Sequence, residues 1–156
     1  MEAGYENGIR MVGKKIELQQ PLEMARKCRE LGIPTKFFFI IGFPWETETE
    51  INETIAYAEK LARHGADRIA LNILKVYPGT PIARLYEIKY PKIYSRMFPN
   101  GDIPDYGQLN GEDPNNTLGK YNSVMRDVSP TPHLTLDELV KKAGECYRRF
   151  EEAKLD

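Results

Sequence analysis

The chain has 156 residues, of which 22 are basic and 23 acidic, so its formal net charge is −1. This length fits about one domain with a sizeable core, and the balanced charge argues against a nucleic-acid partner. No apolar run approaches the roughly 20 residues of a membrane span, and the N-terminus lacks a signal-peptide pattern, so we expect a cytoplasmic protein.

Alternating helix and strand patterns begin near residue 21. Residues 21–32 predict a helix that Pro21 opens and Gly32 ends. Its expected apolar face carries Leu22, Ala25, Cys28 and Leu31. Residues 35–41, TKFFFII, end in five consecutive apolar residues. Such a run is typical of a strand that is covered on both faces, as in parallel sheets.

A second helix and a second strand follow. Thr47 and Glu50 have the spacing of a capping box, and the helical period then continues to Gly65. Residues 67–77 predict a strand that runs into the turn YPGTP. The order strand, helix, strand predicts a parallel pair with a right-handed crossover. A strand should also precede the first helix, but only MEAG stands before the GYENG motif.

The pattern changes after Pro81. Residues 82–98 are aromatic and basic, and we expect them to be helical in part. Residues 99–132 are rich in Asn, Gly, Asp and Pro and lack periodicity, which predicts either a functional lid or partial disorder. Thr135 and Glu138 then predict a second capping box and a final helix. Its apolar face carries Leu136, Leu139, Val140, Ala143, Tyr147 and Phe150.

Three glycine-containing segments lie where strands are expected to end: GYENGIR at 4–10, GFPWETE at 42–48 and YPGTP at 77–81. Ligands of α/β proteins bind beyond the carboxyl ends of the strands. Two carboxylates, one guanidinium and two aromatic rings come from Glu6, Glu46, Arg10, Phe43 and Trp45. This set suits a small ligand with hydroxyls, an ionised end and a flat ring, whereas the phosphate-binding motifs GxxxxGK and GxGxxG are absent.

Each segment also has a purely structural interpretation. The Gly42–Pro44 stretch can be a tight turn between strand and helix, and Glu46 and Glu48 can be helix-N-terminal carboxylates, each worth about 0.3–1 kcal/mol. Glu6 and Arg10 are four residues apart and can form a solvated ion pair on a helix. Local pattern alone leaves these alternatives open.

Taken in order, the three segments resemble the C-terminal half of radical S-adenosylmethionine enzymes, particularly the subclass with an N-terminal cobalamin-binding domain. The GYENG segment with Arg10 corresponds to the family's Gly-x-Glu-x-Gly after the fourth core strand, IIGFPWET to its IIGFPGET after the fifth, and YPGTP follows the sixth. The resemblance implies an α/β fold that is half of a TIM-like (β/α) barrel. Residues 1–87 would form this half, 88–133 an irregular extension, and 134–156 a C-terminal helix.

The resemblance also implies an S-adenosylmethionine pocket. Glu6 would face the ribose hydroxyls, because a carboxylate can accept hydroxyl hydrogen bonds in pairs. Arg10 would reach the methionine carboxylate or the ribose side of the pocket. The edge at Ile40 would pack on the adenine, with backbone near Asn72 completing those contacts. The full set of cofactor-binding residues implied is Gly4, Glu6, Arg10, Ile40, Ile41, Gly42, Glu46, Asn72 and Tyr77.

Two departures from the family pattern limit what this chain should do alone. The CxxxCxxC motif that holds the [4Fe–4S] cluster is absent, and Cys28 and Cys146 cannot supply three thiolates. Trp45 stands where the family usually has glycine. We therefore predict a fragment without catalytic activity of its own, the cluster and possibly cobalamin belonging to the intact parent enzyme. The alternative is a non-catalytic adenosyl-binding or strand-pairing scaffold module.

Association is the last expectation from the sequence. Half of a barrel leaves strand edges and one sheet face uncovered, and KFFFII has the composition of a strand that pairs with another chain. We expect either a homo-oligomer or pairing with the missing N-terminal half, and we expect the final helix to cross between chains. Neither nucleic acid nor a membrane is an expected partner.

Overall fold

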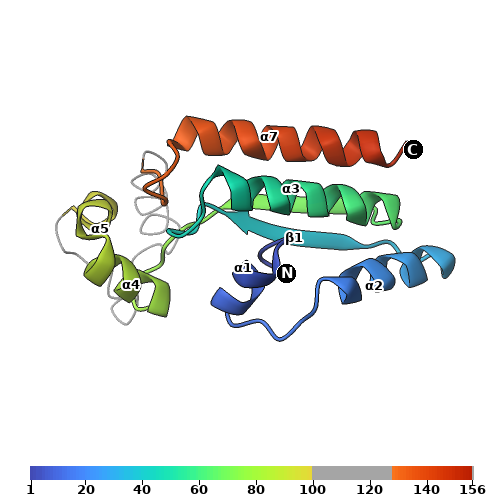
Figure 1. The fold of residues 1–156 in the computed structure, drawn as a ribbon, viewed down its shortest axis with the longest axis horizontal. Helices are drawn as coiled ribbons and strands as arrows, with labels where there is room; N and C mark the ends of the chain where they lie inside the picture. Colours follow the sequence, from blue (N-terminus) through green and yellow to red (C-terminus); the bar gives the residue numbers. More distant parts are fainter. Residues whose placement is uncertain (100–127, 156) are drawn as a thin grey trace, which may run out of the picture.

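The computed structural model describes residues 1–99 and 128–155, so most of the irregular segment expected at 99–132 lies outside the described residues. The described part is a mixed α/β structure (Figure 1). In chain order its elements are α1 (Glu6–Met11), α2 (Gln19–Glu30), β1 (Lys36–Ile41), α3 (Glu48–Arg63), β2 (Arg68–Ile73), α4 (Pro81–Lys89), α5 (Pro91–Met97) and α7 (Leu136–Ala153).

The two described strands are parallel neighbours, with Lys36 opposite Arg68 and Ile41 opposite Ile73. Opposite residues share a face in this register, and successive residues alternate between faces. One face carries Phe37, Phe39, Ile41, Ile69, Leu71 and Ile73. The other, which we call the open face, carries Lys36, Phe38, Ile40, Arg68, Ala70 and Asn72. A partial barrel stays a prediction, since the described sheet has two strands.

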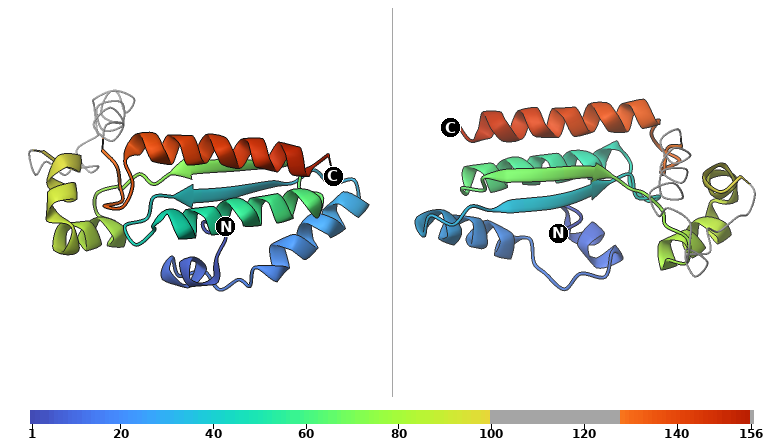
Figure 2. Two further views of the ribbon diagram at one scale, coloured as in Figure 1. Left: turned by 45° about the horizontal axis from the view of Figure 1, so that its top comes forward. Right: turned by 180° about the vertical axis from the view of Figure 1, so that it is seen from behind.

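The open face corrects the expectation that β1 is covered on both sides. Phe38 is 52% exposed, and no described helix crosses this side of the sheet (Figure 2, right). The Lys36 ammonium lies 5.0 Å from the centroid of the Phe38 ring. The apolar run therefore indicated a strand correctly, but composition could not show that part of the run faces solvent in the described structure.

The covered face forms the main core beneath α3. The N-terminus of this helix has the predicted capping box, in which the Thr47 side chain accepts from the Thr49 amide and the Glu50 carboxylate accepts from the Thr47 amide at 2.8 Å. Phe39 and Ile41 pack on the α3 residues Ile51, Ile55, Ala58 and Leu61, all of them buried. Fully burying each of the Phe, Ile and Leu side chains among them stabilises the fold by about 1.5–3 kcal/mol.

Helix α7 lies beside α3 and along β2 of its own chain (Figures 1 and 2). The predicted capping box of Thr135 and Glu138 is present, and Leu139, Cys146 and Phe150 are buried in the main core. The Tyr147 hydroxyl bonds both the amide (2.9 Å) and the carbonyl (3.3 Å) of Leu71. It thereby occupies the backbone groups of Leu71 at the outer edge of β2, and α7 packs on its own chain. That α7 crosses to another chain stays a prediction.

Helices α4 and α5 pack at the carboxyl ends of the strands and form a second core (Figure 1). Pro81 and Pro91 each stand in the first turn of their helix, where proline's missing amide costs nothing. Tyr86 is fully buried, and its hydroxyl donates to the Pro130 carbonyl. The partial helicity expected for residues 82–98 is confirmed. The extension expected to be irregular from residue 88 is corrected at its start, because the proline at the beginning of α5 and the apolar contacts of Ile93 and Met97 support a short helix over residues 91–97.

The N-terminal segment runs along the free side of β1. The Ile40 amide donates to the Glu2 carbonyl at 2.8 Å, which places the first residues where a further strand would pair. Helix α2 begins two residues before Pro21 and ends at Glu30. Leu31 therefore lies beyond the helix and is 74% exposed, which corrects its expected place on the apolar face. Among the described helices, none is long and apolar enough to cross a membrane.

We propose that a second copy of the chain covers the open face, because Phe38 is exposed there and Ile40 and Ala70 are only half-buried. Sedimentation equilibrium at micromolar concentration should show a dimer, and Phe38→Lys should shift it to the 17.9 kDa monomer. Leu31→Lys is the matched control, since this exposed residue lies at the end of α2 and its substitution should leave the mass unchanged. A monomeric wild-type chain would contradict self-association.

Candidate functional site

The carboxyl ends of the strands are organised by one buried carboxylate, that of Glu46. Its side chain is completely inaccessible to solvent. Oε2 accepts from the amides of Gly42 (2.7 Å) and Phe43 (3.0 Å), and Oε1 lies 3.1 Å from the Tyr5 hydroxyl. The Glu46 carbonyl accepts from the Thr131 hydroxyl at 3.0 Å. One residue therefore joins the N-terminal segment, the end of β1 and the loop before α7.

Burial raises the pKa of Glu46 to about 7 from its ordinary value of 4.5. The two amides and the Tyr5 phenol act in the opposite direction, since each favours the carboxylate, and burial outweighs them. The pKa of Tyr5 is raised as well, first by burial and then by the neighbouring Glu46 charge. Near neutral pH the Glu46 carboxyl thus exchanges between a protonated and an ionised form inside the protein.

Two aromatic rings complete this network. Phe43 and Trp45 are stacked, with centroids 4.9 Å apart and planes 12° from parallel. The Trp45 indole nitrogen donates to the Tyr5 hydroxyl at 3.1 Å. Trp45 thus has partners within the chain for both its ring and its N–H.

Gly42 is required by the chain's own packing. Its φ is +90°, which L side chains rarely adopt, and a Cβ here would lie 2.9 Å from Pro130 Cγ and 3.3 Å from Leu139 Cδ1. The loop before α7 therefore fills the space that glycine leaves. Ile41, one residue earlier, is buried in the main core on the α3 side of the sheet. Substituting Gly42 would disturb the fold as well as any ligand site.

Gly4, Glu6 and Arg10 meet in a groove of about 770 Å³ beside α1, which we call the α1 groove. The Gly4 amide donates to Thr54 Oγ1 at 3.1 Å, and a Cβ at Gly4 would lie 2.6 Å from the Thr54 Cα. This glycine allows residue 4 to approach α3 closely. Glu6 and Arg10 are solvent-exposed on α1 and face residues of α2 and α3, including Gln19 and Lys60.

Ile40, Asn72 and Tyr77 meet in a different place. They line a cavity of about 530 Å³ along β2, the sheet cavity, together with Val140 and Ala143 of α7. Ile40 and Asn72 are opposite each other in the strand register, so both project from the open face. The structure thus groups the predicted site residues in three sets: those of the α1 groove, those of the sheet cavity, and the buried Gly42, Ile41 and Glu46.

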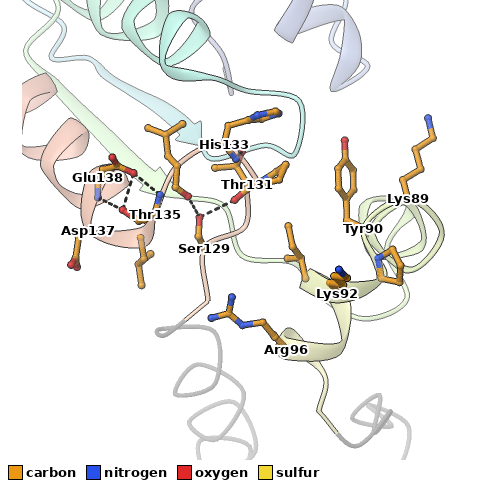
Figure 3. Close-up of a pocket in the computed structure, with 15 residues that line it drawn as sticks. Lys89, Tyr90, Lys92, Arg96, Ser129, Thr131, His133, Thr135, Asp137 and Glu138 are labelled. Atoms are coloured by element: carbon orange, nitrogen blue, oxygen red, sulfur yellow. Dashed lines mark hydrogen bonds between the residues drawn. The ribbon is translucent and has the colours of Figure 1, made fainter.

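Sequence reasoning did not single out a further cavity, of about 980 Å³, between α5 and the start of α7 (Figure 3). Lys89, Lys92 and Arg96 line one wall, and residues 129–138 line the other. We refer to it as the α5 cavity. The basic character of residues 82–98 was a usable signal, but the opposite wall is more than thirty residues away in sequence.

The structure offers no thiolate set for an iron–sulfur cluster. The chain has two cysteines, and they lie on different helices, Cys28 half-buried on α2 and Cys146 buried on α7. Burial raises the pKa of the Cys146 thiol to about 12, which disfavours the thiolate that metals bind. Across residues 1–99 and 128–155, no group of three His, Cys, Asp or Glu side chains could hold a metal ion.

The described residues form an α/β unit with ligand-sized cavities at and beside the carboxyl ends of two parallel strands. No family model matches the chain. Over 87 residues, or 56% of its length, the chain is 37% identical to an uncharacterized methyltransferase of Pyrococcus horikoshii. These residues make up 18% of that protein, so the chain spans less than a fifth of this relative's length. The similarity relates the chain to a methyltransferase-type protein.

The raised pKa of Glu46 predicts a specific pH dependence of stability. Between pH 4.5 and 7 the unfolded chain releases this proton while the folded chain retains it, so the Glu46 contribution falls as pH rises. A difference of about 2.5 pKa units corresponds to a loss of roughly 3 kcal/mol by pH 8. Glu46→Gln keeps the side-chain shape and cannot ionise. The free energy of unfolding of this variant, relative to that of the wild type, should therefore increase as pH rises across this range.

Urea unfolding at pH 5, 6, 7 and 8 measures this difference. Glu53→Gln is the matched control, because Glu53 is an exposed carboxylate on α3 and its substitution should give a constant offset. A constant difference for Glu46→Gln over the same range would mean that Glu46 ionises normally in the folded protein.

Proposed function

We propose that the chain is the C-terminal part of an S-adenosylmethionine-dependent methyltransferase of the radical S-adenosylmethionine type, in the cobalamin-binding subclass. The similarity to a methyltransferase carries the proposal. The order of the GYENG, IIGFPWET and YPGTP segments supports the finer assignment, and half of a (β/α) barrel is the corresponding fold.

In this proposal the adenosyl group of the cofactor lies in the sheet cavity. Ile40 offers an apolar surface and Tyr77 a flat ring for the adenine, while the Asn72 amide can both donate to and accept from a base or a ribose. The cavity of about 530 Å³ is within the range of small-ligand sites. These residues come from adjacent strand ends, where α/β proteins hold their ligands.

The other predicted residues have different roles in the proposal. Glu46 and Gly42 act as positioning residues, because they fix the end of β1 from which Ile40 projects. Glu6 and Arg10 line the α1 groove rather than the sheet cavity. Their proposed contacts with the ribose and the methionine carboxylate therefore belong to the complete, longer protein.

The catalytic centre also belongs to that longer protein. A [4Fe–4S] cluster needs three or four thiolates, and the two cysteines of this chain do not fit that requirement. We derive no radical step for the chain. Its proposed contribution is to bind and orient the adenosyl group of the methyl donor, and cobalamin, if used, would bind elsewhere in the parent enzyme. A non-catalytic adenosyl-binding module is the alternative that uses the same cavity.

Calorimetry with S-adenosylhomocysteine tests the proposed site. We expect weak binding, because this chain supplies only part of the pocket, and Asn72→Ala and Tyr77→Ala should each weaken it about fivefold to tenfold. Glu151→Gln, at an exposed position of α7 that lines neither the sheet cavity nor the α1 groove, should bind like the wild type.

The affinities of the wild type and the variants also separate the adenosyl-binding proposal from the strand-pairing scaffold. If affinity is unchanged in both cavity variants, the ligand lies elsewhere. If the wild-type chain does not bind at millimolar ligand, the strand-pairing scaffold replaces the adenosyl-binding proposal for the isolated chain.

A further inference from the structure

We propose that the α5 cavity binds a small amphipathic anion, in which a phosphate or carboxylate group is held by Lys92 and Arg96 and an apolar body lies between the two walls. The α5 cavity and the sheet cavity share no lining residue, so this inference does not depend on the proposed adenosyl site. Three features of the α5 cavity support this inference: its size, the cations on one wall, and the hydrogen bonds that hold the loop of the other wall.

The cavity has two walls from distant parts of the sequence (Figure 3). Its volume of about 980 Å³ is at the upper end for small-ligand sites. One wall is the junction of α4 and α5, residues 89–96, and the other is the loop 129–135 with the first turn of α7. The half-buried side chains of Tyr90, Ile93 and Leu134 provide apolar surface on both walls.

The cations are gathered on the α5 wall. Lys89, Lys92 and Arg96 line the cavity, and none of them forms an ion pair with a residue of the described ranges 1–99 and 128–155. Figure 3 shows the Arg96 guanidinium reaching from α5 towards the loop at Ser129. A guanidinium binds phosphate or carboxylate through two parallel hydrogen bonds, and a neighbouring ammonium adds a point charge.

The opposite wall carries two carboxylates, which restrict where an anion can lie. The Glu138 carboxylate accepts from the Thr135 amide (2.7 Å) and hydroxyl (2.8 Å), and these bonds lower its pKa. It is therefore ionised but already engaged in the helix cap. Asp137 is exposed on the same turn of α7. An anion is consequently favoured at the α5 wall and disfavoured at the α7 wall, so the ligand's charged end should face Lys92 and Arg96.

The wall formed by the loop 129–135 is held in place by internal hydrogen bonds. The Ser129 hydroxyl donates to the Leu134 carbonyl at 2.6 Å, and the Thr131 hydroxyl donates to the Glu46 carbonyl at 3.0 Å. Tyr86 of α4 bonds the Pro130 carbonyl, which ties the two walls together. A cavity held in this way is formed before the ligand arrives, which lowers the ordering cost of binding.

Four probes test the inference: 1-naphthyl phosphate, 1-naphthoate, 1-naphthol and inorganic phosphate. Titrations followed by two-dimensional NMR should show saturable shifts at residues 89–96 and 129–138 for at least one of the two naphthyl anions. The neutral naphthol and inorganic phosphate should bind at least about tenfold more weakly, because each lacks one half of the recognition. The better of the two anions identifies the preferred head group.

Charge reversal gives the matched pair of variants. Lys92→Glu with Arg96→Glu should weaken binding of the naphthyl anion at least about tenfold. Lys15→Glu with Arg84→Glu makes the same change of net charge at exposed positions that do not line the cavity, and affinity should stay within about twofold. A milder Lys92→Gln, Arg96→Gln variant covers the case in which charge reversal unfolds α5, and it too should lower the affinity.

Three results would overturn the inference: shifts confined to β1 and β2, equal weakening by both charge-reversal pairs, or no saturable binding of either naphthyl anion at millimolar concentration. Shifts confined to β1 and β2 would place the probe on the open face. Equal weakening by both pairs would mean that the affinity depends only on the net charge of the chain.

Discussion

The buried carboxylate of Glu46 is the interaction on which the organisation of the strand ends depends. It holds the Gly42 and Phe43 amides at the end of β1, contacts the Tyr5 phenol of the N-terminal segment, and receives the Thr131 hydroxyl through its own carbonyl. An unpaired carboxylate in this position would be strongly unfavourable, so the Gly42 and Phe43 amides and the Tyr5 phenol stabilise its burial, whereas Thr131 bonds the backbone carbonyl of Glu46. Burial still raises its pKa to about 7.

The consequences extend to the cavities. Fixing Gly42 sets the direction of Ile40, which lines the sheet cavity, and fixing Thr131 sets the loop that forms one wall of the α5 cavity. The same network accounts for the aromatic residues of the GFPWETE segment, because Phe43 and Trp45 stack and Trp45 bonds Tyr5. A turn that looked suited to a ligand is therefore largely engaged with its own chain, while the ligand-sized spaces lie on either side of it.

The edges of the sheet and its open face differ in how far they are covered. Tyr147 occupies backbone groups at the outer edge of β2, and the Glu2 carbonyl occupies one amide of β1. On the open face, in contrast, about half of the Phe38 surface is exposed to solvent. The methyltransferase relative contains much more chain than is matched here. Covering this face, by a second copy or by further (β/α) units, would bury the apolar surface that the described helices leave accessible.

Several features could be predicted from the sequence because they depend on local chemistry. The capping boxes at Thr47 and Thr135 occur as their spacing indicates, since a cap involves residues three positions apart. The strand at 36–41 follows from its apolar run. The sequence predicts a site at three glycine-containing segments; residues around Glu6 and around Ile40 line two separate cavities, and that these cavities hold a ligand stays a prediction.

Tertiary structure decided the rest, because the deciding contacts join residues far apart in the chain. Whether Glu46 is a solvated helix-end charge or a buried anchor depends on Tyr5 and Thr131, 41 and 85 positions away. Whether Glu6 and Ile40 share one pocket depends on the path of the N-terminal segment against α3. The α5 cavity needs both Arg96 and the loop after residue 128. Composition and periodicity record which side chains a segment carries, and only packing determines which of them meet.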